Sequence, residues 1–309
     1  MLAIFLKTLP FFALIGLGYG AAKTRFFTEE ASAYLTKFVF YFALSAMLFR
    51  FSANLSIGEI FDPWLAAAYL WATAFVYGIA LMVAFWRRVK VETAAIEAQC
   101  AAIGNTGFLG VPMLALLLGE AAVAPIILIL SIDMIVFSSL LVILIEGSRD
   151  GRMSPGVLRT IGIGLLKNPM IVSISLGLMV AASGMGLPQP VNEFVTILGN
   201  AATPGALFAI GASLASKSAE RLVIAGWLSF AKLGLHPLLV AVGTFLLFPV
   251  DPFAAGVAVS AAALPVAGNV FILAQHYGTS PQRVSASILI STVASIVTVS
   301  AWIAWVTGG

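Results

Sequence analysis

Long apolar runs recur along almost the whole chain and constrain its fold more than any other feature. A helix needs about twenty apolar residues to cross a bilayer, and its backbone must pair within itself there. Composition agrees, because 61% of the 309 residues are hydrophobic and only 9% are charged, whereas soluble domains carry roughly 25% charged residues. The sequence therefore predicts an all-α polytopic membrane protein with ten transmembrane helices. The predicted spans are residues 3–22, 31–51, 63–86, 93–118, 121–145, 167–184, 191–215, 222–248, 252–276 and 282–306.

Two of these spans contain helix-breaking residues near their middle. The breaks lie within Ala98–Pro112 and Ala261–Phe271. A broken backbone is tolerated at membrane depth only where it is buried in protein or lines a cavity, because an unpaired amide in hydrocarbon is costly. Two Gly/Pro-interrupted segments at matching positions are typical of the binding site of an inverted-repeat transporter.

The longest polar linker, Glu146–Pro155, divides the spans into two sets of five. An odd number of spans per set makes the two sets antiparallel in the membrane. Shifting residues 101–112 by about 160 positions gives 261–272, so both breaks fall in the fourth helix of their set. We expect a first five-helix repeat over 1–146, a cytoplasmic linker over 147–157 and a second, inverted repeat over 158–309.

The basic residues are distributed on one side of this topology. Alternate loops hold twelve of the sixteen Lys and Arg residues, and such loops are retained in the cytoplasm. The sequence therefore predicts an inner (plasma) membrane protein with both termini outside. The twelve are Lys23, Arg25, Arg87, Arg88, Lys90, Arg149, Arg152, Arg159, Lys167, Lys217, Arg221 and Arg283.

Neutral polar residues accompany both breaks. The amino end of a helix carries about half a positive charge and attracts anions. Asn105, Thr106 and Asn269 add uncharged donors and acceptors beside these ends, which suits a carboxylate that must bind and then leave. The alternative is that the two asparagines only satisfy the interrupted backbone.

Ionisable residues also lie within predicted spans, where charges are functional by default. Asp133 and Lys232 could form a structural ion pair; otherwise Asp133 could carry a proton or Lys232 could attract an anion. Glu97 is a second candidate proton carrier or a solvated entrance residue. His236 precedes Pro237 and is expected to bond to backbone that the proline frees.

The sequence does not indicate an enzyme. Two histidines and one cysteine, Cys100, cannot build the usual metal clusters. A phosphate-binding loop and a nucleophile elbow are both absent from the sequence. We expect no cofactor, no metal and no nucleic acid partner.

The segment Asn105–Pro112 resembles the Asn-Thr-x-x-x-Gly-Ile/Val-Pro signature of the auxin efflux carrier family, which includes the plant PIN-type carriers. Leu264–Pro265 with Phe271 resembles the second crossover segment of that family. Ala43–Phe49 and Lys232–Pro237 also fit, so the resemblance covers essentially the whole chain. The sequence departs from the plant pattern at Ser45 and Leu48 and has a short central linker, so it looks like a compact bacterial member.

The resemblance implies a ten-helix inverted repeat with a scaffold of helices 1, 2, 6 and 7. Helices 3–5 and 8–10 would form a mobile transport domain, and the scaffold would form a homodimer. Helices 4 and 9 would cross at Pro112 and Pro265, and Asn105 would contact the substrate.

We therefore expect a secondary transporter that exports an organic anion, either an auxin-like monocarboxylate or a small dicarboxylate, by alternating access. The alternative is a cation/proton antiporter or a sodium-coupled bile-acid-type symporter of related fold. A third possibility, a membrane receptor that does not transport, gains nothing obvious from two helix breaks.

Overall fold

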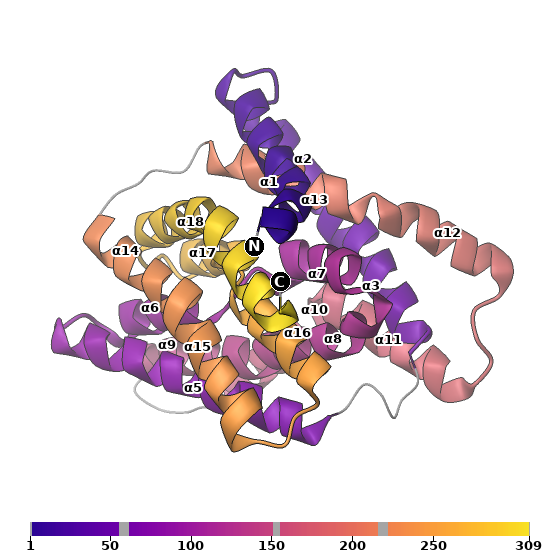
Figure 1. The fold of residues 1–309 in the computed structure, drawn as a ribbon. Coiled ribbons are helices and arrows are strands. Elements are labelled where there is room, and N and C mark those ends of the chain that lie inside the picture. Colours follow the sequence, from indigo (N-terminus) through magenta and orange to yellow (C-terminus); the bar gives the residue numbers. More distant parts are fainter. Residues whose placement is uncertain (1, 56–61, 151–154, 216–221, 309) are drawn as a thin grey trace.

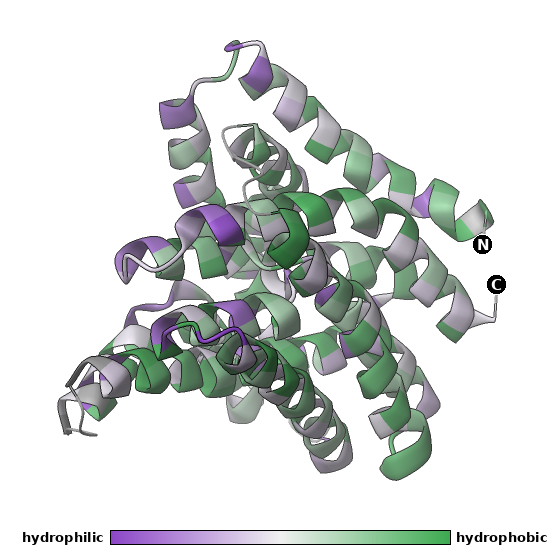
Figure 2. Cartoon of the chain, turned by 90° about the vertical axis from the view of Figure 1, so that its left-hand side faces the viewer, coloured by the Kyte–Doolittle hydropathy of each residue, from purple (hydrophilic) through white to green (hydrophobic). Residues whose placement is uncertain are grey.

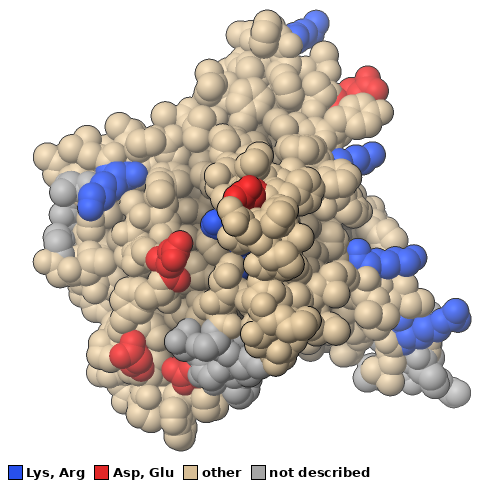
Figure 3. Space-filling view, turned by 90° about the vertical axis from the view of Figure 1, so that its right-hand side faces the viewer, with Lys and Arg blue, Asp and Glu red and all other residues tan. Residues whose placement is uncertain are grey.

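The computed structural model describes residues 2–55, 62–150, 155–215 and 222–308. Over these ranges the chain is helical, and its only β-type pairing is an isolated antiparallel bridge between Gly104 and Val266. Figure 1 shows how the helices are arranged. Hydrophilic residues gather in the connecting segments (Figure 2), and much of the face seen in Figure 3 carries no charged side chain.

The first half of the chain forms five runs of helix. In chain order the elements are α1 (Leu2–Lys23), α2 (Glu29–Phe38), the π-helical turn η1 (Val39–Ala43), α3 (Leu44–Ala53), α5 (Pro63–Trp86), α6 (Val91–Ala102), the π-helical turn η2 (Thr106–Gly110), α7 (Val111–Leu118), the 3-10 turn η3 (Glu120–Ala122), α8 (Val123–Ile132), the π-helical turn η4 (Asp133–Phe137) and α9 (Ser138–Asp150).

The described residues of the second half form a further series of helices. Its elements are α10 (Pro155–Lys167), α11 (Pro169–Ser183), α12 (Gln189–Asn200), α13 (Ala202–Leu214), α14 (Leu222–Phe230), the π-helical turn η5 (Ala231–Leu235), α15 (His236–Val242), the π-helical turn η6 (Gly243–Leu247), α16 (Pro252–Ala262), α17 (Gly268–His276) and α18 (Pro281–Thr307).

Seven helical runs in the described ranges are long and apolar enough to cross a membrane, and an eighth results if α10 and α11 count as one bent span. The two interrupted segments, α6 to α7 and α16 to α17, fall below that length because each is broken. The chain is therefore an all-helical polytopic membrane protein.

The sixth predicted span begins earlier than expected. It was placed at 167–184, yet α10 is helical from Pro155 and joins α11 at a bend of 71°. The bend has a local cause, because the residue before a proline avoids helical backbone. Asn168 precedes Pro169 and its side chain accepts a hydrogen bond from the Met170 amide at 3.0 Å, which starts α11 afresh. The predicted linker, 147–157, is helical at both ends, and residues 151–154 lie outside the described residues.

Apart from α10, which contacts both α9 and α11, the helices pack mainly in two groups. One group contains α1, α2, α3, α11, α12 and α13, and the other contains α5 to α9 and α14 to α18. Within the first group α1 and α13 touch backbone to backbone, because a Cβ atom on Gly18 would overlap the Phe208 carbonyl and one on Gly211 would overlap the Ile15 carbonyl. Small residues permit such close approach between membrane helices.

Candidate functional site

The two helix breaks meet and complete each other's backbone hydrogen bonding. The Asn105 amide donates to the Pro265 carbonyl at 2.8 Å, and the Ala267 amide donates to the Ile103 carbonyl at 3.2 Å. Proline has no amide hydrogen to donate, which helps to end helical pairing at 265. The glycine at 104 also leaves room, since a Cβ there would lie 3.0 Å from Lys232 Cε. Residues far apart in sequence thus form one centre.

The amino end of α17 is left with unpaired donors. In the described part of the chain, the backbone amides of Gly268 and Asn269 donate no hydrogen bond. These are the first two residues of α17, where no acceptor exists one turn earlier in the same helix. Such an end, with its partial positive charge, is suited to an anion.

A cavity of about 680 Å³ lies against these breaks. Asn105 and Asn269 both line it, as does Gly268. Its other walls come from α2, η1, η4, α9, α10, α13 and α18, and they are mainly apolar. We call this the central cavity. The Phe40 and Phe108 rings stack in its wall, with centroids 5.9 Å apart.

The asparagine side chains do not serve the interrupted backbone in the described part of the chain. Asn105 is buried and its side-chain amide has no described hydrogen-bond partner. Asn269 is half-buried, and its Oδ1 atom likewise has none. Both therefore have hydrogen-bonding capacity available to a molecule in the central cavity.

The other residues predicted for the binding site lie behind the cavity wall. Thr106 is 1% exposed and lies beside Asp133, yet its Oγ1 atom has no partner among the described residues. Pro112 starts α7 and Pro265 lies in the second break; both are buried and neither lines the central cavity.

Asp133 and Lys232 belong to a buried polar layer behind the breaks. Both lie in π-helical turns, η4 and η5, which are frequent at functional sites. The Tyr69 hydroxyl donates to Asp133 Oδ1 at 2.9 Å, and Oδ2 has no described partner. The Lys232 ammonium donates to the Ala262 carbonyl at the end of α16. The described ion pairs do not include one between Asp133 and Lys232.

His236 connects Lys232 to α5. Its Nδ1 atom lies 3.0 Å from Lys232 Nζ, and its Nε2 atom lies 3.0 Å from Thr73 Oγ1. The expectation of a bond to backbone freed by Pro237 is replaced by these two side-chain contacts. Tyr69 and Thr73 were not singled out from the sequence, because their partners are 64 and 163 residues away.

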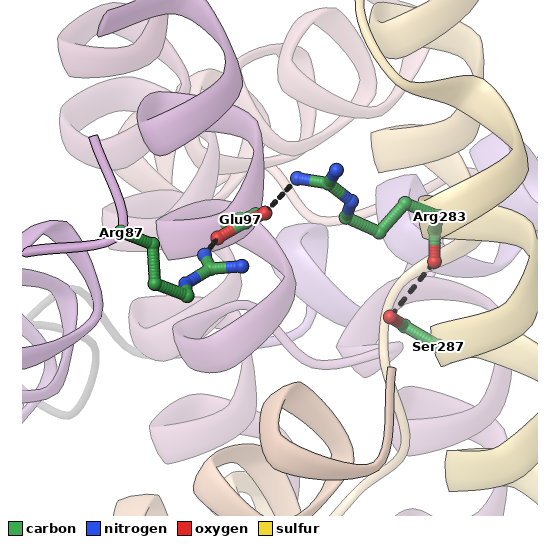
Figure 4. Close-up of polar contacts among 4 residues, drawn as sticks. All are labelled: Arg87, Glu97, Arg283 and Ser287. Carbon is green, nitrogen blue, oxygen red and sulfur yellow. Dashed lines mark hydrogen bonds and ion pairs between the residues drawn. The ribbon is translucent and has the colours of Figure 1, made fainter. Parts of the chain in front are cut away.

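Glu97 is not the solvated residue considered from the sequence. It is 1% exposed and forms ion pairs with Arg87 and Arg283 (Figure 4). A buried carboxylate requires compensating charge, which the two guanidinium groups provide. Arg283, counted among the basic loop residues, is itself 7% exposed. This cluster joins α6 to α18 and to the end of α5, and none of its members lines the central cavity.

The described residues offer no group of three or more His, Cys, Asp or Glu side chains that could hold a metal ion. The chemistry available at the breaks is therefore that of neutral amides and helix ends. Two broken helices that meet inside a helical membrane bundle are typical of membrane carriers.

Comparison with known proteins identifies the family. Residues 3–303 match the family described as membrane transport protein, and the chain belongs to it. A putative malonate transporter of Rhizobium meliloti is 32% identical over 298 residues, which cover 94% of this chain and 92% of the relative. The uncharacterized transporter YfdV of Escherichia coli is 25% identical over 98% of both chains. Auxin efflux carrier component 5 of Arabidopsis thaliana is 23% identical over 93% of this chain and 92% of its own length. The resemblance to auxin efflux carriers is thereby confirmed.

Proposed function

We propose that this protein is a secondary transporter of an organic anion, a monocarboxylate or small dicarboxylate, with its substrate site at the junction of the two helix breaks. The observation that carries the proposal is the convergence of Asn105, Asn269 and the unpaired amides of α17 on one cavity. Neutral donors at a positive helix end hold an anion without binding it irreversibly. The names of two relatives, a putative malonate transporter and an auxin efflux carrier component, support a carboxylate as the substrate.

The proposed architecture is two inverted five-helix repeats, with α1 to α9 in the first and α10 to α18 in the second. The packing groups support a division into a scaffold and a transport domain, because the helices of the first and second spans pack with those of the sixth and seventh. The first and last helices contact each other near the two ends of the chain, where the Thr8 and Ser300 hydroxyls lie 2.7 Å apart. This supports both ends lying on the same side of the membrane, as an even number of spans requires. Alternating access would move the transport domain against the scaffold, and the scaffold would form the homodimer.

The cavity suggests a direction of access. The central cavity extends along α9, α10 and α13 toward the loops predicted to be cytoplasmic. A second cavity of about 720 Å³ shares Thr36 and Ser213 with it and is also lined by Lys23 and Arg25. Basic residues at a mouth raise the local concentration of anions. This arrangement supports capture of the anion from the cytoplasm and hence export.

Coupling is proposed to involve the buried polar layer. Asp133 has one oxygen without a described hydrogen-bond partner, and the described ion pairs do not include this carboxylate. It can take up a proton, whereas Lys232 is held by His236 and the Ala262 carbonyl. We assign Asp133 the coupling role and Lys232 a role in stabilising the carbonyl end of α16.

The test is transport by purified protein in liposomes. Labelled malonate, acetate and indole-3-acetate are offered to the wild type and to Asn105→Ala. We expect flux of at least one carboxylate by the wild type and a loss of affinity in the variant. Flux of sodium or protons without any organic anion would support the cation carrier instead, and binding without flux would support a receptor.

A further inference from the structure

One charged side chain in the central cavity has no role in the proposed function. Of the described residues that line this cavity, only Lys37 carries a charge at neutral pH; the rest are apolar or neutral. It lies in the last turn of α2, and its ammonium lies 5.5 Å from the centre of the Tyr34 ring. The ion pairs of the described residues do not include Lys37. The cavity therefore carries one positive charge that the protein does not balance.

The position of Lys37 relative to the breaks follows from the stacked rings in the wall. Phe40 lies three residues after Lys37, about one turn along the same helical face. Its ring is nearly parallel to that of Phe108, at an interplanar angle of 9°, and Phe108 lies three residues after Asn105. Lys37 and Asn105 thus each lie three residues before one ring of the stacked pair, and both line the same cavity.

The two ends of the cavity offer different chemistry. At the breaks, amides and asparagines provide neutral donors for one carboxylate. At α2, a lysine on a flexible four-carbon stem provides a full charge that can reach toward a second anionic group. A monocarboxylate would leave one of the two ends unused.

We propose that Lys37 is a substrate-binding residue and that it gives the cavity a preference for dianions, in which one carboxylate lies at the α17 amino end and the other at the Lys37 ammonium. This inference rests on the proposed function. Because Lys37 belongs to the helix group of α1 and α13, whereas Asn269 belongs to the other group, the substrate bridges the two groups. Movement between the groups would separate Lys37 from the breaks and promote release.

The test compares a dianion with a monoanion in the same variants. Lys37→Gln removes the charge with little change in length, and Lys37→Arg keeps it. Lys7→Gln is a matched control, because Lys7 is exposed and lines neither cavity. Initial rates of labelled malonate and acetate transport are measured in liposomes at equal internal and external salt. Losing a charged hydrogen bond should raise the KM for malonate in Lys37→Gln about tenfold. The KM for acetate should stay within about twofold, and Lys37→Arg should restore the KM for malonate. Lys7→Gln should keep the wild-type KM for both substrates.

If Lys37→Gln changes the KM for malonate and the KM for acetate equally, or changes neither, the inference is overturned and the proposed function is left intact. Failure of Lys37→Arg to restore malonate would also overturn it, because the charge would then not be the cause. If the wild type moves neither malonate nor acetate nor indole-3-acetate, the proposed function fails first. Lys37 is exposed, so the variants should fold, which thermal unfolding of the purified proteins would verify.

Discussion

At the scale of residues, the buried carboxylate of Glu97 is neutralised by arginines that come from other parts of the fold. Glu97 is neutralised by Arg87 from the end of α5 and by Arg283 from the start of α18. The Nε atoms of both arginines have no described hydrogen-bond partner, so Glu97 is the contact that balances them. The cluster lies outside the central cavity, which makes it a test of stability rather than of binding.

Glu97→Gln should lower the thermal stability of the purified protein. Removing one partner of a buried ion pair typically costs about 3–5 kcal/mol, because the remaining charge is left uncompensated. Arg87 is partly exposed, so the penalty should come mainly from Arg283. The double variant Glu97→Gln with Arg283→Gln should recover part of the melting temperature. An unchanged melting temperature in Glu97→Gln would show that water compensates the arginines.

Asp133→Asn separates coupling from folding. If Asp133 carries the coupling proton, the variant should bind malonate with unchanged affinity and lose the dependence of transport on a proton gradient. Tyr69→Phe removes only the hydrogen bond to Asp133 Oδ1 and should keep that dependence. Should Asp133→Asn fail to fold while an added Lys232→Met restores folding, the two charges would be a structural pair and the coupling assignment would be wrong.

At the scale of elements, the sequence predicted those features that depend only on neighbouring residues, such as the positions of the two helix breaks. Glycine and proline interrupt a helix through their own backbone, so their positions predict where a break falls. Both interruptions lie within the predicted segments. The helix α10 was missed because residues 155–166 lack an apolar run of membrane-spanning length. The roles of Tyr69, Thr73 and Arg283 could not be read from one sequence, since each depends on contact across the fold.

The backbone contact between α1 and α13 predicts that alanine substitutions at Gly211 and Gly16 differ in their effect on thermal stability. A methyl group at Gly211 would overlap the Ile15 carbonyl, so Gly211→Ala should force the helices apart and cost about 1–3 kcal/mol. Gly16→Ala is the control on the same helix pair, because no atom lies within 4 Å of the added carbon. Thermal unfolding in detergent should give a lower midpoint for Gly211→Ala alone. Equal midpoints would mean that α1 and α13 do not pack this closely.

At the scale of the whole molecule, the membrane class followed from hydropathy, and the charge pattern provided a topology that labelling can check. Cys100 is the single cysteine and is buried, so cysteines introduced elsewhere can be labelled selectively. In a Cys100→Ser background, a cysteine replacing Lys90 should react with an impermeant maleimide only from the cytoplasmic side. One replacing Asp251 should react only from outside. The reverse pattern would invert the topology and the proposed direction of transport.

The central claim is that the two helix breaks together form an anion site, and binding of labelled malonate to the purified protein tests it most directly. Each of Asn105→Ala and Asn269→Ala should weaken binding about tenfold, as loss of a hydrogen bond to a charged group does. The control, Asn200→Ala, alters an exposed residue outside the central cavity and should bind as the wild type does. Wild-type affinity in both cavity variants would contradict the account.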